Sequence, residues 1–232
     1  MSKKVLVVGC QSYYDPHVSF GTYTGDIKLL EKDPASVRLV VFIGGADINP
    51  KLYGHEKFEL TGCSDACDNR DIAVFNSAQA NHVPCAGICR GGQFLTVMAG
   101  GHLIQHVSGH GCSHSMTTHT GKEMKVTSTH HQMFGWPLPE GAQLLGWATE
   151  KYAKKAYNQN KIYSSLLKTR WASCTEYAYE PAHVEPDYEP EIVYYPNINS
   201  LAAQYHPEMM DESTEGFKFY VEQVEKLLSN SF

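Results

Sequence analysis

One cysteine stands among three glycines in the heptapeptide GICRGGQ, residues 87–93, directly after a short apolar run. A strand, a small residue, Cys89 and a glycine-rich helix start together predict a tight turn that lifts the thiol above the carboxyl edge of a sheet. The positive end of the following helix lowers a thiol pKa from about 8.5, and the amide of Arg90 is placed to donate to an oxyanion. Taken alone, the heptapeptide fits a nucleophile or a buried thiol. A phosphate-binding turn is less favoured, because no G-x-x-x-x-G-K-[ST] pattern is present.

A thiol nucleophile needs a base, and the base needs a group that orients it. The segment QYHPE places His206, Pro207 and Glu208 at the end of the apolar run SLAAQY. Proline stiffens the backbone there, and residues two apart in an extended chain project to the same side. The sequence therefore predicts a hydrogen-bonded imidazole and carboxylate, with a surface His-Pro turn as the alternative.

Together, GICRGGQ and QYHPE resemble the class I glutamine amidotransferase superfamily, whose members use a Cys-His-Glu triad. The resemblance implies that Cys89 is the nucleophile, His206 the general base and acid, and Glu208 the orienting carboxylate. It also implies a flavodoxin-like, three-layer fold in which helices flank a doubly wound, mostly parallel sheet with a small antiparallel element.

A narrower similarity points to the γ-glutamyl hydrolase branch (peptidase C26), best known from the γ-glutamyl-γ-aminobutyrate hydrolases. It runs in register over residues 40–132 and again over 191–209, in the segments GGADINPKLYG, DNRD, GICRGGQ, GGHLIQH and STHHQ. Two departures stand out. Only about thirty residues separate Gly9 from the strand near Leu39, and PEIVYYPN replaces the D-G-x-x-E-A segment that often precedes the last strands. These departures bear on the leaving group rather than on the triad.

The narrower similarity implies an oxyanion hole made by the backbone amides of Gly45 and Arg90. It also implies contacts between the glutamyl group of the substrate and Gln93 and the segment around His130 and His131. In the reaction it implies, the thiolate attacks the γ-carbonyl of glutamine or of a γ-glutamyl amide. The leaving amine is protonated, and water then hydrolyses a γ-glutamyl thioester. No cofactor is required.

The elements that must position these groups are visible as continuous apolar runs at residues 4–9, 38–45 and 83–88. Continuous rather than alternating hydrophobicity is typical of strands covered on both faces of a parallel sheet. Helical spacing predicts a helix over 68–81, a short helix after Cys89 that stops at Gly100 and Gly101, and a C-terminal amphipathic helix.

Strands are also expected in EMKVTSTHHQ and AQLLGWAT. Two more are expected in EIVYYPNINSLAAQYHPE, joined by a Pro-Asn turn.

Composition limits the remaining function classes. The 232 residues predict a single domain over 1–232, with an irregular insertion at about 150–190. The formal charge of −6 comes without a basic stripe, so no nucleic-acid surface is expected. No apolar run is long enough to span a bilayer, and no secretory signal is recognisable. Seven cysteines without framework spacing predict reduced thiols and a cytoplasmic protein.

A histidine-rich stretch follows the nucleophile helix. Its members are His102, His106, His110, His114 and His119, with Cys112 between them. Spacings of four suggest zinc on one helical face, but the glycines between them make such a helix improbable. We therefore predict no metal site, and place His110 or His114 near the substrate cleft. Cys63 and Cys67 are expected to be reduced thiols beside a helix start.

Three functions are compatible with the sequence. The first is a stand-alone amidohydrolase for a small γ-glutamyl substrate, and a homodimer is compatible with it. The second is a glutaminase subunit that delivers ammonia to a separate synthetase partner. The third is a catalytically silent binding module, which the intact triad argues against.

Overall fold

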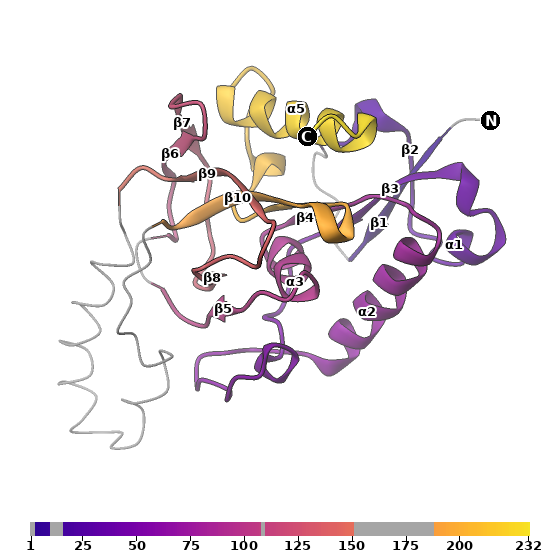
Figure 1. The fold of residues 1–232 in the computed structure, drawn as a ribbon, viewed down its shortest axis with the longest axis horizontal. Coiled ribbons are helices and arrows are strands. Elements are labelled where there is room, and N and C mark those ends of the chain that lie inside the picture. Colours follow the sequence, from indigo (N-terminus) through magenta and orange to yellow (C-terminus); the bar gives the residue numbers. More distant parts are fainter. Residues whose placement is uncertain (1–2, 10–15, 108–109, 151–187) are drawn as a thin grey trace.

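A computed structural model describes residues 3–9, 16–107, 110–150 and 188–232. Most of the predicted insertion, residues 151–187, lies outside the described residues. A nine-stranded sheet in the order β2-β1-β3-β4-β11-β10-β9-β6-β7 forms the centre of the fold (Figure 1). The first five strands in this order are parallel, and they are β2 Thr22–Thr24, β1 Lys4–Val8, β3 Val37–Phe42, β4 Cys85–Ile88 and β11 Ser200–Ala203. The prediction of a mostly parallel, doubly wound sheet is confirmed.

The pairing of neighbouring strands changes from parallel to antiparallel at β11. The strands beyond it run antiparallel to their neighbours, and they are β10 Pro190–Tyr195, β9 Gln143–Ala148, β6 His114–Thr118 and β7 Glu123–Val126. A separate two-stranded antiparallel sheet pairs β5 Leu103–Ile104 with β8 Met133–Phe134. The predicted antiparallel part therefore exists, but it is larger than expected.

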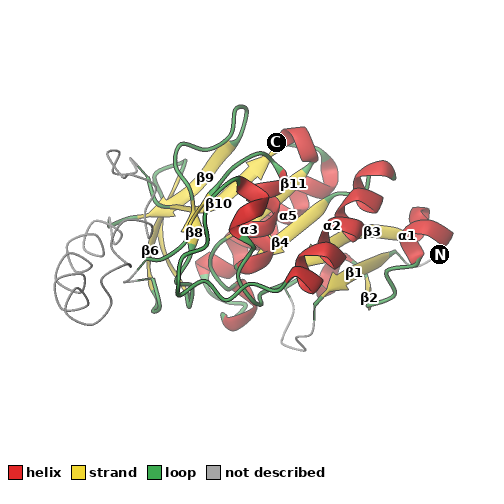
Figure 2. Ribbon diagram, turned by 90° about the horizontal axis from the view of Figure 1, so that it is seen from below, coloured by secondary structure: helices red, strands yellow, loops and turns green. Residues whose placement is uncertain are grey.

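Helices cover both faces of the sheet (Figures 1 and 2). One face is covered by α2 Asp65–Ala80 and α3 Arg90–Met98, with the one-turn α1 Leu29–Lys32 beside α2. The other face is covered by α5 Glu215–Ser229. Five short 3-10 helices complete the described elements: η1 Val18–Phe20, η2 Pro34–Ser36, η3 Pro50–Tyr53, η4 Pro196–Ile198 and η5 Pro207–Met209.

The alternation of side chains along β3 explains this layering. Val40 and Phe42 lie in the core that α2 and α3 cover, whereas Leu39 and Val41 lie in the core that α5 covers. All four side chains are fully buried. From Leu39 to Phe42 the strand is buried on both faces, which is why this part of its sequence reads as a continuous apolar run after the exposed Arg38.

Three differences from the sequence-based predictions are local. The α2 helix begins at Asp65, which is three residues earlier than predicted. The short interval before β3 still contains β2 and α1. The predicted strand EMKVTSTHHQ ends at Val126, and its second half is a loop. Among the described residues, no helix is long and apolar enough to cross a membrane.

The close approach of α3 to β3 gives a first prediction. A Cβ added at Gly91 would overlap the backbone carbonyl of Phe42, whereas a Cβ added at Gly25 meets nothing within 4 Å. Alanine normally stabilises a helix by about 1 kcal/mol relative to glycine, but overpacking a core costs about 1–3 kcal/mol. We therefore expect Gly91→Ala to lower the free energy of unfolding in urea, and Gly25→Ala to leave it nearly unchanged. Equal stability of the two variants would contradict the tight contact between α3 and β3.

Candidate functional site

Cys89 occupies a strained turn between β4 and α3. Its φ of 52° and ψ of −111° are unusual for a residue with a side chain. The Cys89 amide donates to the carbonyl of Ala203 in β11 at 2.8 Å, and the Cys89 carbonyl accepts the amide of Gln93 at 2.9 Å. One bond therefore ties the turn to the sheet while the other begins the helix. This is the elbow that the sequence predicts.

His206 and Glu208 form the predicted pair at the end of β11. The Nδ1 atom of His206 lies 2.6 Å from Oε1 of Glu208. The backbone amide of His206 donates to the carbonyl of Thr127 at 2.8 Å, which fixes the residue against the loop after β7. Because β11 lies beside β4, the imidazole arrives next to Cys89.

Electrostatics favour a protonated imidazole at this position. Burial alone would lower the pKa of His206, but its side-chain interactions with Cys89 and Glu208 outweigh burial and raise the pKa to about 10. A charged partner within hydrogen-bond distance stabilises the charged form of an ionisable group. The arrangement can therefore hold a thiolate beside an imidazolium.

Thr129 is a member of the site that sequence reasoning missed. Its hydroxyl lies 2.9 Å from Nε2 of His206, on the side of the ring opposite the Glu208 carboxylate. The residue lies within the segment STHHQ, but nothing in its spacing indicates which of those side chains meets the imidazole. The contact depends on the long-range pairing that brings this loop to the end of β11.

The structure brings the two predicted oxyanion positions together. A Cβ built on Gly45 would lie 3.8 Å from Cδ of Arg90, so the turn after β3 and the first residue of α3 are neighbours. The Arg90 Nε atom donates to the carbonyl of Ala46 at 3.0 Å. The side chain of Arg90 thus ties the loop after the Gly44-Gly45 turn to the first residue of α3.

Arg90 is itself clamped by two carboxylates of α2. Its guanidinium donates to Asp68 Oδ1 at 2.5 Å and also to Asp71 Oδ2. All three side chains are buried. The other oxygen of Asp68 accepts the amide of Asn49 at 3.0 Å, which connects the clamp to the loop after the Gly-Gly turn. The segment DNRD is similar to the family pattern, but sequence alone did not reveal that it holds Arg90.

The three residues expected to contact substrate lie in different surroundings. Gln93 is buried, and its amide donates to the carbonyl of Gln132 at 3.0 Å and lies 3.3 Å from Gln204 Oε1. His130 is also buried, whereas His131 is half-exposed and pairs with Asp47 Oδ1 at 3.1 Å. Of the three, His131 is the one beside the Gly-Gly turn that is open to solvent. Substrate contact by these residues stays a prediction.

The histidine-rich stretch does not form one helix. Its described part contains β5 and β6, so the spacing of four does not place these histidines on a common helical face. His110 and His114 are buried against Glu189 and Glu191 rather than exposed in a cleft. Cys63 and Cys67 are free thiols, as predicted.

Comparison with known proteins identifies relatives of the whole arrangement. Residues 23–208 match the model of the Peptidase C26 family. Over 70 residues the chain is 40% identical to a glutamine amidotransferase-like protein of Lactococcus lactis subsp. lactis, covering 30% of each chain. Over 118 residues it is 32% identical to a glutamine amidotransferase-like protein of Mycobacterium tuberculosis, covering 42% of this chain and 38% of that protein. The matches therefore span well under half the length of these relatives.

Solved structures share the fold at low sequence identity. A glutamine amidotransferase from Thermotoga maritima superposes with a TM-score of 0.53 at 16% identity, covering 99% of this chain and 90% of that chain. The glutaminase domain of CTPS from Trypanosoma brucei, with bound acivicin, superposes with a TM-score of 0.55 at 10% identity and covers 99% and 95% of the two chains. These superpositions confirm the fold class.

The buried pair of His206 and Glu208 gives a pH-dependent prediction. Because the pKa of His206 is raised from 6.5 to about 10 in the folded protein, its stabilising contribution is fully present below pH 6.5 and is lost as the pH rises through 10. We expect Glu208→Gln to lower this pKa by about 1–3 units, as loss of an adjacent opposite charge does. Imidazole NMR titration measures the shift directly. Urea unfolding should show a wild-type advantage at pH 6 that shrinks at pH 10.5, and a pH-independent difference would contradict the pairing.

The clamp around Arg90 gives a prediction about stability. Arg90→Met leaves the buried Asp68 without its cation and Asp71 with Arg70 alone, and breaking a buried pair in this way costs about 3–5 kcal/mol. The matched control is Lys122→Met, which breaks the exposed pair with Glu215 and should cost at most about 1 kcal/mol. Urea denaturation at neutral pH measures both. Similar losses in the two variants would show that the buried clamp contributes no more than a surface pair.

Proposed function

This chain belongs to the Peptidase C26 family, and we propose that it hydrolyses the γ-glutamyl amide bond of glutamine or of a γ-glutamyl amine. The reaction passes through a γ-glutamyl thioester on Cys89. The observation that carries the proposal is the strained Cys89 turn, placed beside the His206–Glu208 pair. A nucleophile, a base and a group that orients the base are the elements that thiol hydrolases combine.

In the first step, the thiolate of Cys89 attacks the γ-carbonyl carbon. A carbon–sulfur bond forms, and the carbonyl electron pair moves onto oxygen. The backbone amides of Gly45 and Arg90 are the proposed donors to this oxyanion, and the hydrogen bond from Arg90 Nε to the carbonyl of Ala46 supports this assignment. Preorganised donors of this kind contribute about 10²–10³ in rate each.

The His206 imidazole then accounts for the proton transfers. His206 carries a proton on Nε2, and it transfers this proton to the leaving nitrogen as the carbon–nitrogen bond breaks. Glu208 accepts the Nδ1 proton in a hydrogen bond throughout, so the ring keeps its orientation. In the second half-reaction, neutral His206 takes a proton from water, the hydroxide attacks the thioester, and the thiolate is released.

The Thr129 hydroxyl fits this scheme as a positioning group. It lies 2.9 Å from Nε2 of His206 and can accept a hydrogen bond from Nε2–H while this nitrogen is protonated. The imidazole is thus held from both nitrogens. Because Thr129 reaches substrate only through His206, it is not assigned a catalytic role.

A second candidate function is a glutaminase subunit that passes ammonia to a separate synthetase. This candidate is supported by two of the structural neighbours, the glutaminase domain of CTPS and PurLQS from Thermotoga maritima. The fold and the triad serve both functions equally well. What separates them is whether the protein turns over without a partner. We further propose that residues 1–232 form one domain and that the enzyme acts in the cytoplasm.

The central test replaces the nucleophile. We expect Cys89→Ala to abolish glutamate release, because no other group can form the thioester. The matched control is Cys112→Ser, at an exposed thiol, which should retain wild-type turnover. A glutamine-derived affinity reagent should label Cys89 alone among the seven cysteines, as read by peptide mass spectrometry. Undiminished hydrolysis by Cys89→Ala would refute the assignment.

A substrate panel distinguishes the two candidate functions. It comprises glutamine, γ-glutamyl-aminobutyrate, γ-glutamyl-polyamines and poly-γ-glutamate, each assayed by steady-state glutamate release. A stand-alone hydrolase turns over at least one member at full rate by itself. A glutaminase subunit stays nearly idle on all of them until its synthetase is added.

A further inference from the structure

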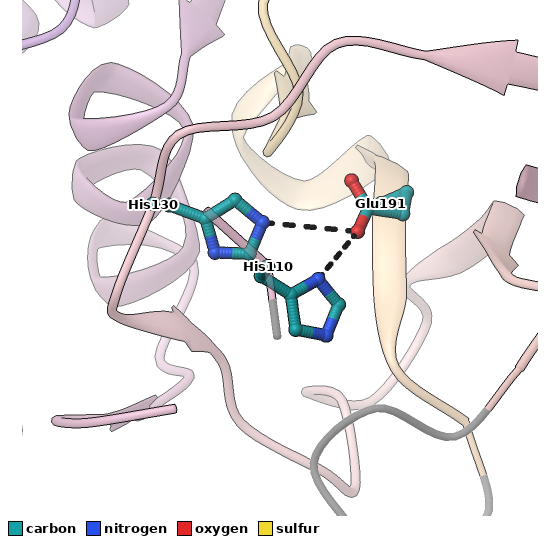
Figure 3. A group of neighbouring side chains, drawn as sticks. All are labelled: His110, His130 and Glu191. Carbon is teal, nitrogen blue, oxygen red and sulfur yellow. Dashed lines mark ion pairs between the residues drawn. The ribbon is translucent and has the colours of Figure 1, made fainter. Parts of the chain in front are cut away.

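A buried cluster of histidines and glutamates lies apart from the proposed reaction. It joins three parts of the chain: the loop after β7, the segment that leads into β6, and β10 with the residue before it. Its members are His110, His114, His130, Glu189 and Glu191, each at most 4% exposed. Figure 3 shows three of them, with the two imidazoles turned toward the Glu191 carboxylate.

One carboxylate oxygen is the focus of this cluster. Oε1 of Glu191 lies 2.9 Å from Nε2 of His114, 3.4 Å from Nδ1 of His110 and 3.8 Å from Nε2 of His130. Potential ligand atoms of His110, His130 and Glu191 all lie within 4.8 Å of one another. Three ring nitrogens therefore converge on one oxygen in a space that water does not reach.

The hydrogen bonds of His130 determine which of its nitrogens can bind a metal. Its Nδ1 lies 2.7 Å from the carbonyl oxygen of Gln132, and a carbonyl only accepts, so Nδ1 carries the proton. In the neutral ring, a proton on Nδ1 leaves the lone pair on Nε2. A lone pair on Nε2 then faces Glu191, and Nε2 has no hydrogen-bond partner among the described residues. A lone pair opposite a carboxylate is repulsive unless a cation lies between them.

His110 is oriented in a comparable way from the other side. Its Nε2 lies 2.9 Å from Oε2 of Glu189, so Nε2–H donates and Nδ1 is the atom that faces Glu191. The carboxylates of Glu189 and Glu191 both lie against the buried ring of His110, at 2.9 Å from Nε2 and 3.4 Å from Nδ1. The pair of buried carboxylates thus requires positive charge, which either a proton or a metal ion can supply. A carboxylate on the far nitrogen is also how metal-bound histidines are usually oriented.

We propose that Nδ1 of His110, Nε2 of His130 and the Glu191 carboxylate bind a Zn²⁺ ion. Zinc takes imidazole nitrogen and carboxylate oxygen at about 2.0–2.2 Å, so ligand atoms in a tetrahedral site lie roughly 3.3–3.5 Å apart. The separations of 3.4 and 3.8 Å from Oε1 need only small side-chain movements to reach that geometry. His114 and Glu189 hold the ligands in place as positioning residues.

The proposed site uses a different set of residues from the one that histidine spacing along the chain suggested. Spacing within residues 102–119 suggested several ligands on one helix, and that helix does not form. The fold instead takes His110 from that stretch and combines it with His130 and Glu191, which lie far from it in the chain. The expectation of no metal site came from spacing within that stretch alone, which does not report these distant partners.

The ion would stabilise the loop that contacts the proposed triad. Thr129, the residue before His130, hydrogen-bonds His206, and the carbonyl of Gln132 accepts from both His130 and Gln93. Fixing His130 therefore fixes the loop on both sides of it. The zinc site stands on its own contacts and does not depend on the proposed reaction.

The test uses the full chain with any affinity tag removed. Wild-type protein, dialysed against metal-free buffer after exposure to Zn²⁺, should retain about one zinc per chain in elemental analysis. X-ray absorption should show two imidazoles and carboxylate oxygen around the ion, without sulfur. Because this measurement uses the wild type, it does not depend on whether a variant folds. Zinc-free protein after loading, or a sulfur-containing shell, would overturn the proposal.

Variants then locate the site. We expect His130→Gln and Glu191→Gln to weaken Zn²⁺ binding more than 100-fold, beyond the roughly 10–100-fold expected for the positioning variant His114→Gln. The matched control is His119→Gln, an exposed histidine of the same stretch, which should bind Zn²⁺ as the wild type does. Unchanged affinity in folded His130→Gln and Glu191→Gln proteins would overturn the assignment.

Discussion

The whole arrangement depends on how closely the first turn of α3 lies against the sheet. A side chain at Gly91 would overlap the backbone of β3, and one at Gly92 would lie 2.5 Å from the carbonyl oxygen of Ala203 in β11. This contact forces Cys89 into a positive φ, which costs about 1–3 kcal/mol, and the surrounding strands hold it there. The same contact places Cys89 at the start of α3 and next to the His206 ring.

Buried ion pairs fix the charged side chains around this backbone contact. Arg90 is neutralised by two aspartates of α2, so it connects the Gly-Gly turn to the nucleophile helix without bringing an unpaired charge into the interior. Glu208 does the same for His206. In each case a carboxylate fixes a cationic group that would otherwise be free to turn. The geometry of the site thus rests on paired charges as well as on packing.

Much of the parallel sheet and of the candidate site could be predicted from the sequence, because the sequence patterns that indicate them are local. The apolar runs of β1, β3 and β4 predict strands buried on both faces, and the triad residues lie in two short motifs. The rest depends on distant pairing. Thr129 reaches His206 only because the loop after β7 lies against the end of β11, and no periodicity encodes that contact. The convergence of His110 and His130 on Glu191 was missed for the same reason, because spacing along the chain does not report proximity across a sheet.

The position of β11 has a consequence for how the protein is made. This strand pairs Ser200 with Cys85 and Ala203 with Ile88, so more than a hundred residues after the elbow must be available before the two strands can meet. Contacts of such long sequence separation form late and slowly. During synthesis the thiol therefore emerges well before its imidazole. Cys89 and His206 can meet only after β11 has left the ribosome and paired with β4.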